Sequence, residues 1–175
     1  MKATLYGAEA DELRDLVDRF SVIQLVDEEP DIVICYGGDG TLLSAEQQWP
    51  GIPKVPIRNS ARGHRCIPHP PAAVLERLAD NALVRTEFLK LSCCVYRDDG
   101  DKPTCGLLAM NEFNVHMGYI NSAVRLRVWI DDEPYGPTIY ETNDHEVIGD
   151  GLVVSTPFGS TAYFNQITRG VFHTG

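Results

Sequence analysis

The hydrophobic pattern of the N-terminal part of the chain alternates between strand-like runs and a helical stripe. Residues 2–6 and 22–26 predict short strands, and between them four apolar side chains recur at the spacing of an amphipathic helix over residues 9–20. These side chains are Leu13, Leu16, Val17 and Phe20. The apolar run from Asp31 to Tyr36 is rich in β-branched residues, which is typical of a strand buried on both faces. This order of elements predicts a parallel α/β layer.

The pattern changes near residue 80. Before that point we expect a helix over residues 41–48, a strand over 54–57 and a helix over 70–79 that begins with two prolines. Beyond it, alternating apolar and polar residues predict strands separated by turns, at residues 83–96, 104–116, 123–130 and 135–141. We therefore expect an α/β domain over residues 1–80 and a β-rich domain over residues 81–175.

Charge and composition narrow the classes of partner. The 175 residues include 25 acidic and 15 basic side chains, for a formal charge of −10, without a Lys/Arg cluster. Nucleic acid is therefore not expected as a partner, whereas a small phosphorylated ligand remains compatible, because backbone amides and helix N-termini neutralise phosphate locally. No apolar run is long enough for a membrane span, and the first residues lack the apolar region of a secretory signal.

The cysteines predict a reducing compartment. The chain has five, an odd number without CxxC pairs or regular spacing, which favours unpaired thiols and a cytoplasmic location. Cys35 lies in the apolar run before Tyr36, where we expect a small buried hydrophobic side chain.

The sharpest local signal is the sequence Gly37-Gly38-Asp39-Gly40-Thr41, which follows the buried strand. Parallel sheets bind ligands at the carboxyl ends of their strands, and glycines there let backbone amides approach a phosphate. Asp39 suits a base for a hydroxyl group or an orienting group for Mg²⁺ better than a direct phosphate contact. A tight turn with Asp39 or Thr41 as a helix cap explains the same residues equally well.

Two further segments carry polar groups in apolar surroundings. Asn111 and Glu112 are adjacent within an expected strand, so they face opposite sides; a strand end beside a ligand or a solvent-facing edge would accommodate both. The segment from Asp150 to Tyr163 is an apolar strand followed by hydroxyl groups, Pro and Gly and then an expected helix start at Ser160 or Thr161, which suits a ligand-binding loop.

In this order, the three segments resemble the NAD kinase family, which phosphorylates the 2′-hydroxyl of the adenosine ribose of NAD. The resemblance extends from about residue 31 to Tyr163. It implies an α/β nucleotide-binding domain with a parallel sheet, followed by a β-rich, sandwich-like domain, often in a homo-oligomer. It also implies a divalent metal, usually Mg²⁺, with ATP or polyphosphate as donor and NAD as the small-molecule substrate; the metal ligands are left unassigned.

The resemblance implies a role for each matching residue. Asp39 would be the general base, with Gly38 and Gly40 beside the ligand. The residues expected to contact NAD are Asn111, Glu112, Asp150, Thr161, Ala162 and Tyr163.

The chain also departs from the family pattern. Ala61 stands where the family has glycine, the segment after Tyr163 is bulkier, and the β-rich part is short. The basic loop that contains Arg58, Arg62 and Arg65 suits either donor phosphates or solvent. These departures keep open a non-catalytic NAD(H)-binding protein of the same fold. The first segment alone also resembles lipid kinases of the diacylglycerol type.

Overall fold

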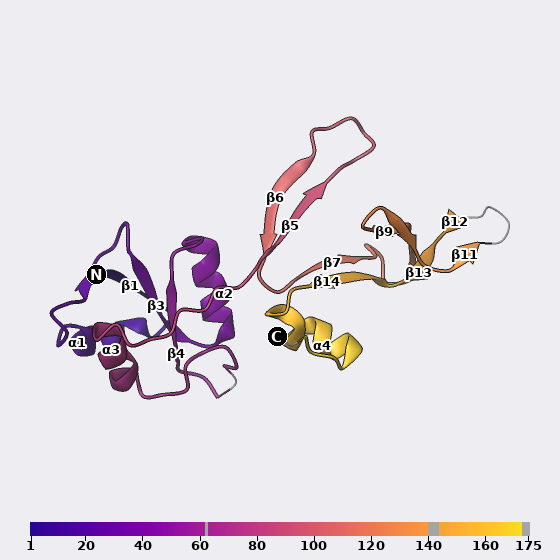
Figure 1. Cartoon of the computed structure of the whole chain (residues 1–175). Helices are drawn as coiled ribbons and strands as arrows, with labels where there is room; N and C mark the ends of the chain where they lie inside the picture. The colour runs from indigo at the N-terminus through magenta and orange to yellow at the C-terminus, as the bar shows by residue number, and fades with distance from the viewer. Residues whose placement is uncertain (62, 140–143, 173–175) are drawn as a thin grey trace. The chain divides into compact units, whose positions relative to one another are not determined.

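The computed structural model describes residues 1–61, 63–139 and 144–172. The chain forms two compact units, Met1–Thr86 and Glu87–Gly175, which we call unit 1 and unit 2 (Figure 1). The sequence pattern placed the change of composition slightly earlier, at residue 80. In the described residues, no helix is both long and apolar enough to cross a membrane.

Unit 1 is built on a four-stranded parallel sheet in the order β2-β1-β3-β4. The strands are β1 (Lys2–Tyr6), β2 (Gln24–Leu25), β3 (Ile32–Gly37) and β4 (Lys54–Arg58). The chain leaves β1 toward β2 on one side and then crosses to β3 on the other side. The strand order therefore reverses between β1 and β3, and the carboxyl ends of these two strands form the place where open parallel sheets bind ligands.

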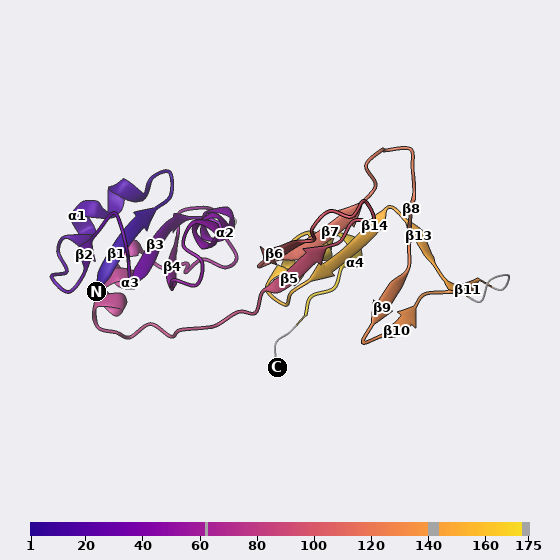
Figure 2. The same ribbon diagram turned by 90° about the horizontal axis from the view of Figure 1, so that it is seen from above.

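Helices cover both faces of this sheet (Figure 2). They are the 3-10 helix η1 (Ala10–Leu13) and the α-helices α1 (Arg14–Val17), α2 (Asp39–Gln48) and α3 (Pro71–Ala79). Residues of η1, α1 and α3 pack with Ile34 and Ile57 in one core, whereas Ala45 of α2 packs with Val33 and Cys35 in the other. The single helix expected over residues 9–20 is instead two short pieces, although its apolar stripe faces the core as expected.

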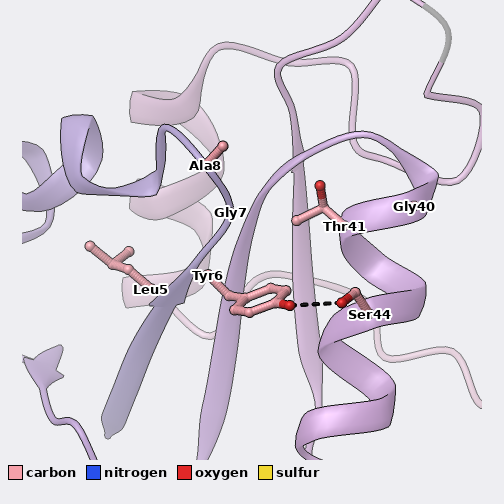
Figure 3. Close-up of a pocket in the computed structure, with 7 residues that line it drawn as sticks. All are labelled: Leu5, Tyr6, Gly7, Ala8, Gly40, Thr41 and Ser44. Carbon is pink, nitrogen blue, oxygen red and sulfur yellow. Dashed lines mark hydrogen bonds between the residues drawn. The ribbon is translucent and has the colours of Figure 1, made fainter.

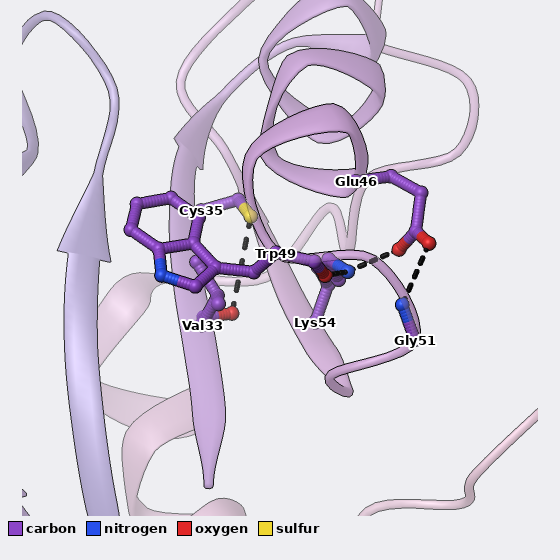
Figure 4. Close-up of polar contacts among 6 residues, drawn as sticks. All are labelled: Val33, Cys35, Glu46, Trp49, Gly51 and Lys54. Atoms are coloured by element: carbon purple, nitrogen blue, oxygen red, sulfur yellow. Dashed lines mark hydrogen bonds and ion pairs between the residues drawn. The ribbon is translucent and has the colours of Figure 1, made fainter. Parts of the chain in front are cut away.

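Polar contacts fasten the end of α2 to the sheet. The Lys54 ammonium on β4 donates to the Glu46 carboxylate and to the Trp49 carbonyl oxygen (Figure 4). The other Glu46 oxygen accepts from the Gly51 N–H at 2.8 Å, and the Trp49 ring packs edge-on against Tyr6 at 5.3 Å. These contacts fix the axis of α2 and thereby the position of its first turn.

Unit 2 consists of antiparallel strand pairs and short helices. The pairs are β5-β6, β7-β14, β8-β13, β9-β10 and β11-β12. The strands are β5 (Leu91–Val95), β6 (Thr104–Ala109), β7 (Glu112–His116), β8 (Val124–Leu126), β9 (Val128–Ile130), β10 (Glu133–Tyr135), β11 (Thr138–Ile139), β12 (Asp144–His145), β13 (Val147–Gly149) and β14 (Gly151–Ser155). After β14 come the 3-10 helix η2 (Gly159–Thr161) and α4 (Tyr163–Thr168).

These strands are shorter than the sequence pattern predicted. The expected strand over residues 83–96 is confined to β5, and the expected strand over 104–116 is broken into β6 and β7. Residues 140 and 141 of the last expected strand lie outside the described part of the chain.

Two cysteines form a disulfide, contrary to the expectation of unpaired thiols. Cys94 on β5 is bonded to Cys105 on β6, with their Cα atoms 4.1 Å apart. Cys93 pairs with Leu107 and Val95 with Thr104, so two residues of β6, Cys105 and Gly106, lie opposite Cys94. This bulge brings the two cysteines together, and a cytoplasmic location therefore loses the support that unpaired cysteines would give it.

Candidate functional site

Asp39 is the first residue of α2, directly after the buried strand β3. Gly38 is the N-cap of α2 and no side chain makes a cap bond there, so the alternative in which Asp39 or Thr41 caps the helix is wrong. Gly37 is required by close packing, because a Cβ atom there would lie 2.2 Å from the Thr41 hydroxyl oxygen. The glycines therefore allow a sharp passage from strand to helix, which places the Asp39 carboxylate at the carboxyl edge of the sheet.

The Asp39 carboxylate is held by three consecutive residues of the basic loop. The N–H of His64 donates to Oδ2 at 3.0 Å, and the N–H of Arg65 donates to Oδ1 at 2.8 Å. The Cys66 thiol also donates to Oδ1, at 3.7 Å. Arg62, one of the arginines expected to bind donor phosphates, lies outside the described residues.

A pocket of about 520 Å³ opens beside Gly40, between the end of β1 and the start of α2 (Figure 3). Its lining residues are Leu5, Tyr6, Gly7, Ala8, Gly40, Thr41 and Ser44. Gly7 has a φ of +136°, and a Cβ atom there would lie 2.1 Å from the Tyr36 carbonyl oxygen. The Tyr6 hydroxyl and the Ser44 hydroxyl share a hydrogen bond of 2.7 Å across the pocket.

This pocket lies where the strand order reverses, and its volume is that of a small-molecule site. The residues at the end of β1 that line the pocket were not predicted from the sequence. A glycine directly after the first expected strand, Gly7, could have indicated them. Gly40 was expected beside the ligand, and no atom outside its own neighbourhood lies within 4 Å of where its Cβ would be.

In unit 2, Asn111 and Glu112 lie at the break between β6 and β7. The carbonyl oxygen of Asn111 accepts from the N–H of Thr156 at 2.8 Å and from the Ser155 hydroxyl at 3.3 Å. A Cβ atom on Gly159 would lie 2.2 Å from the same oxygen. The structure thus brings Asn111, from the second sequence signal, into direct contact with the middle of the third, residues 155–159.

Glu112 is partly buried, and its Oε2 atom has no hydrogen-bond partner among the described residues. Burial raises the pKa of this carboxyl group above its ordinary value, because desolvation penalises the charged form. An unpartnered carboxylate oxygen at a strand break is suited to accept a hydrogen bond from a ligand hydroxyl group.

The last three predicted residues follow on η2 and α4. Thr161 and Tyr163 are exposed, and Ala162 between them joins the two helices with a φ of −94° and a ψ of −127°. The buried Ser160 hydroxyl donates to the Pro157 carbonyl oxygen at 2.8 Å and accepts from the N–H of Phe172 at 3.0 Å. Ser160 therefore has a structural role, while the exposed Thr161 and Tyr163 are accessible to a ligand.

Asp150 is separated from this group. The β7-β14 ladder pairs Ser155 with Glu112 at one end and Gly151 with His116 at the other. Asp150 is exposed beyond the far end, where its carbonyl oxygen accepts from the N–H of Met117 at 3.2 Å. The four residue steps of β7 from Glu112 to His116 span roughly 13 Å. Asp150 and Asn111 lie beyond opposite ends of this ladder and are therefore not neighbours.

The predicted residues therefore form two groups. Gly38, Asp39 and Gly40 belong to unit 1, and the expected NAD contacts belong to unit 2. Among the described residues, no three His, Cys, Asp or Glu side chains are placed to hold a metal ion.

Comparisons with known proteins give sequence relatives and a fold relative. No protein-family model matches the chain. The NAD kinase of Enterococcus faecalis is 32% identical over 157 residues, which are 86% of this chain and 55% of the relative. The NAD kinase of Brucella melitensis is 32% identical over 151 residues, which are 86% of this chain and 53% of the relative. The chain thus spans about half the length of these curated relatives.

A solved structure, yeast NADH kinase complexed with NADH, has a similar fold. The TM-score is 0.72 at 16% sequence identity, and the match covers 99% of this chain and 62% of the yeast chain. This likeness supports the predicted fold class, an α/β domain followed by a β-rich domain.

Proposed function

We propose that the chain is a member of the NAD kinase family, about half of whose length it spans, and that it phosphorylates NAD. In this proposal, a phosphoryl group passes from ATP or polyphosphate to the 2′-hydroxyl of the adenosine ribose, which yields NADP. The observation that supports it best is the placement of Asp39 at the first turn of α2, next to a pocket at the reversal of strand order.

Asp39 is proposed as the general base. Phosphoryl transfer has a loose transition state, so its catalysis depends on positioning and charge neutralisation more than on a strong base. A half-buried carboxylate whose two oxygens are held by backbone N–H donors has a defined direction, and a carboxylate oxygen can accept further hydrogen bonds. It can therefore take the proton from an aligned ribose hydroxyl group as the phosphoryl group arrives.

Unit 2 is proposed to hold the dinucleotide. The free Oε2 of Glu112 accepts a ligand hydroxyl, while Asn111 offers its side-chain amide from a backbone fixed against Thr156. Tyr163 offers an exposed ring with a polar tip. Asp150, at the far end of the ladder, contacts a part of the ligand distant from the Glu112 site in this proposal.

A magnesium ion would neutralise charge on the donor phosphates. The described residues do not fit a protein-bound magnesium site, because no three His, Cys, Asp or Glu side chains among them are placed to hold a metal ion. Mg²⁺ is often held mainly by substrate phosphates and water. We therefore propose that it arrives on the donor, and we assign it no protein ligands.

Self-association through unit 2 is a further part of the proposal. Large apolar side chains are exposed on its strands, among them Val115, Trp129 and Ile148, and the sheets of this unit have two strands each. Open sheet edges with apolar side chains favour association with another surface. Sedimentation of the pure protein tests this point: a homo-oligomer supports it, and a monomer at micromolar concentration contradicts it.

The test of the function is NADP formation from NAD with Mg²⁺, with ATP and polyphosphate supplied separately. We expect product with the wild type and a loss of about 10²-fold or more in kcat for Asp39→Asn, with the KM for NAD changed much less. Asp18→Asn, which removes an exposed carboxylate of the same unit, is the matched control and should behave as the wild type. Saturable NAD binding without product from either donor would overturn the proposal in favour of a non-catalytic NAD(H)-binding protein.

A further inference from the structure

A buried thiol lies against the carboxylate that the proposed function uses as its base. We propose that Cys66 is a positioning residue for phosphoryl transfer: its thiol fixes the direction in which the Asp39 carboxylate accepts the substrate proton. This inference rests on the proposed function, since it needs Asp39 to be the base. None of the three sequence segments that resemble the NAD kinase family includes Cys66.

The geometry of the contact supports this role. The Cys66 sulfur donates to Oδ1 of Asp39 at 3.7 Å, and the N–H of Arg65 donates to the same oxygen at 2.8 Å. The N–H of His64 holds Oδ2 at 3.0 Å. The two backbone donors fix where the carboxylate lies. The Cys66 thiol is a second donor to Oδ1, so it further restricts rotation of the Asp39 carboxylate about its Cβ–Cγ bond.

The Cys66 sulfur is itself fixed by the sheet. Cys66 is 6% exposed, and the next residue, Ile67, is bonded to β4: its N–H donates to the Pro56 carbonyl oxygen at 2.7 Å, and its own carbonyl oxygen accepts from the N–H of Arg58 at 3.2 Å. Asp39 follows β3, the neighbour of β4. Base and thiol are therefore anchored on adjacent strands, so the distance between them is set by the sheet.

Burial and the neighbouring carboxylate keep the Cys66 thiol in the protonated form that donates. Burial, and then the nearby Asp39 carboxylate, raise the pKa of the Cys66 thiol to about 11, while Arg58 opposes this shift. At neutral pH the sulfur consequently carries its proton and can donate it to Oδ1. A thiolate at the same place would repel the carboxylate.

A buried cysteine that only fills space is the ordinary alternative. Cys35 is the matched control, because it is also a buried free thiol of unit 1, but its sulfur contacts the Val33 carbonyl oxygen at 3.8 Å and is not bonded to Asp39. Removing either thiol leaves a cavity of similar size. Only removal of the Cys66 thiol should alter the reaction at unchanged NAD binding.

The first experiment compares NADP formation by Cys66→Ala, Cys66→Ser and Cys35→Ala, with thermal unfolding as the check on folding. For Cys66→Ala we expect kcat to fall about 10-fold with the KM for NAD within twofold, since misdirected catalytic groups lower kcat rather than substrate binding. Cys66→Ser keeps a donor and should recover part of the loss. A wild-type kcat for Cys66→Ala, or an equal loss for Cys35→Ala, would overturn the proposal.

The second experiment needs no enzymatic activity. Iodoacetamide alkylation at pH 9 is followed by peptide mass spectrometry in the wild type and in Asp39→Asn. Loss of the neighbouring charge should speed the alkylation of Cys66 several-fold and leave Cys35 unchanged. Equal Cys66 rates in the two proteins would overturn the contact. Faster alkylation in Asp39→Asn, together with a wild type that makes no NADP, would overturn the proposed function and, with it, the positioning role.

Discussion

Replacing Gly159 with alanine should destabilise unit 2, because this glycine is in contact with the backbone of the Asn111 segment. A Cβ atom at residue 159 would lie 2.2 Å from the Asn111 carbonyl oxygen and 2.4 Å from its carbonyl carbon and Cα. Backbone atoms cannot rotate away as the end of a side chain can. The two segments would therefore have to move apart by about 1 Å to reach an ordinary van der Waals distance.

The size of the effect follows from the hydrogen bonds at this contact. A separation of that size breaks the bond from the Thr156 N–H to the Asn111 carbonyl oxygen, now 2.8 Å, and the bond from the Ser155 hydroxyl, now 3.3 Å. Each is worth about 0.5–1.5 kcal/mol, and overpacking adds about 1–3 kcal/mol when the neighbours cannot relax. We expect a loss of about 2–6 kcal/mol, which lowers the unfolding midpoint of a unit of this size by at least roughly 8 °C.

The assay is thermal unfolding of the whole chain, followed by circular dichroism and calorimetry. Gly149→Ala is the matched control: it lies in the same unit, its φ is outside the left-handed region, and no atom lies within 4 Å of the new Cβ. It should change stability by no more than about 0.5 kcal/mol. If Gly159→Ala unfolds at the same temperature as Gly149→Ala, the packing of the 155–163 segment against Asn111 is not as the structure describes.

Three further changes test other parts of the molecule. Burial raises the pKa of Glu112 above its ordinary 4.5, so the stability contribution of this group is complete below that pH and is lost as pH rises through the raised pKa. Glu112→Gln should raise the unfolding midpoint at pH 7 but not at pH 4, and parallel melting curves across this range would contradict the reasoning. The Cys94–Cys105 disulfide joins residues 11 apart in the sequence, so Cys94→Ser should lower the free energy of unfolding in urea by about 3 kcal/mol. Cys93→Ser, which removes a free thiol of the same strand, should not lower it. Equal urea midpoints for the two variants would count against the disulfide. Lys54→Met removes the ammonium partner of the Glu46 carboxylate from a nearly buried ion pair and should lower the free energy of unfolding by about 3 kcal/mol. Adding Glu46→Gln to this variant should recover part of the loss. If the double variant recovers none of it, packing of the Lys54 side chain matters more than its charge.

The first unit follows the hydrophobic pattern more closely than the second. The buried run at residues 31–36 becomes β3, and the proline-initiated segment becomes α3. Both are specified locally, by β-branched residues and by helix-start chemistry. The helix expected over residues 9–20 is instead two short pieces, η1 and α1. The apolar stripe indicates which of its side chains are buried, but it does not determine where the helical hydrogen bonding begins and ends, which depends on packing against the sheet.

In unit 2, alternation indicates which residues can be extended but does not determine which strands pair. The break at Met110 and Asn111 arises because the Asn111 backbone bonds to Thr156, more than forty residues later. The Cys94–Cys105 bond depends on a bulge in which Gly106 has a φ of +80°. Such pairings depend on contacts between segments distant in sequence, which periodicity does not encode.

The candidate site shows the same division between local and distant information. The glycines around Asp39 form a local signal, so its position at the end of a buried strand was predictable from the sequence. Its partners were not, because residues 64–66 reach the carboxylate only when Ile67 pairs with β4. The Gly7 side of the pocket likewise depends on β1 lying next to β3. Glycine is needed at residue 7 because the Tyr36 carbonyl of β3 lies against it, a contact that the local sequence does not reveal.

The proposed base lies in unit 1 and the proposed dinucleotide contacts lie in unit 2, so binding and chemistry should be separable by mutation. Unit 1 contributes a carboxylate held by loop donors and the start of a helix, which in the proposal act on the transferring phosphoryl group and the proton. Unit 2 contributes polar groups at a strand break, which in the proposal contact the dinucleotide whether or not transfer occurs. Changes at Asp39 or Cys66 should therefore appear in kcat, and changes at Asn111 or Tyr163 in the KM for NAD. A variant of either group that altered both constants equally would mean that one unit performs both tasks, and the assignment of the base to unit 1 alone would then be wrong.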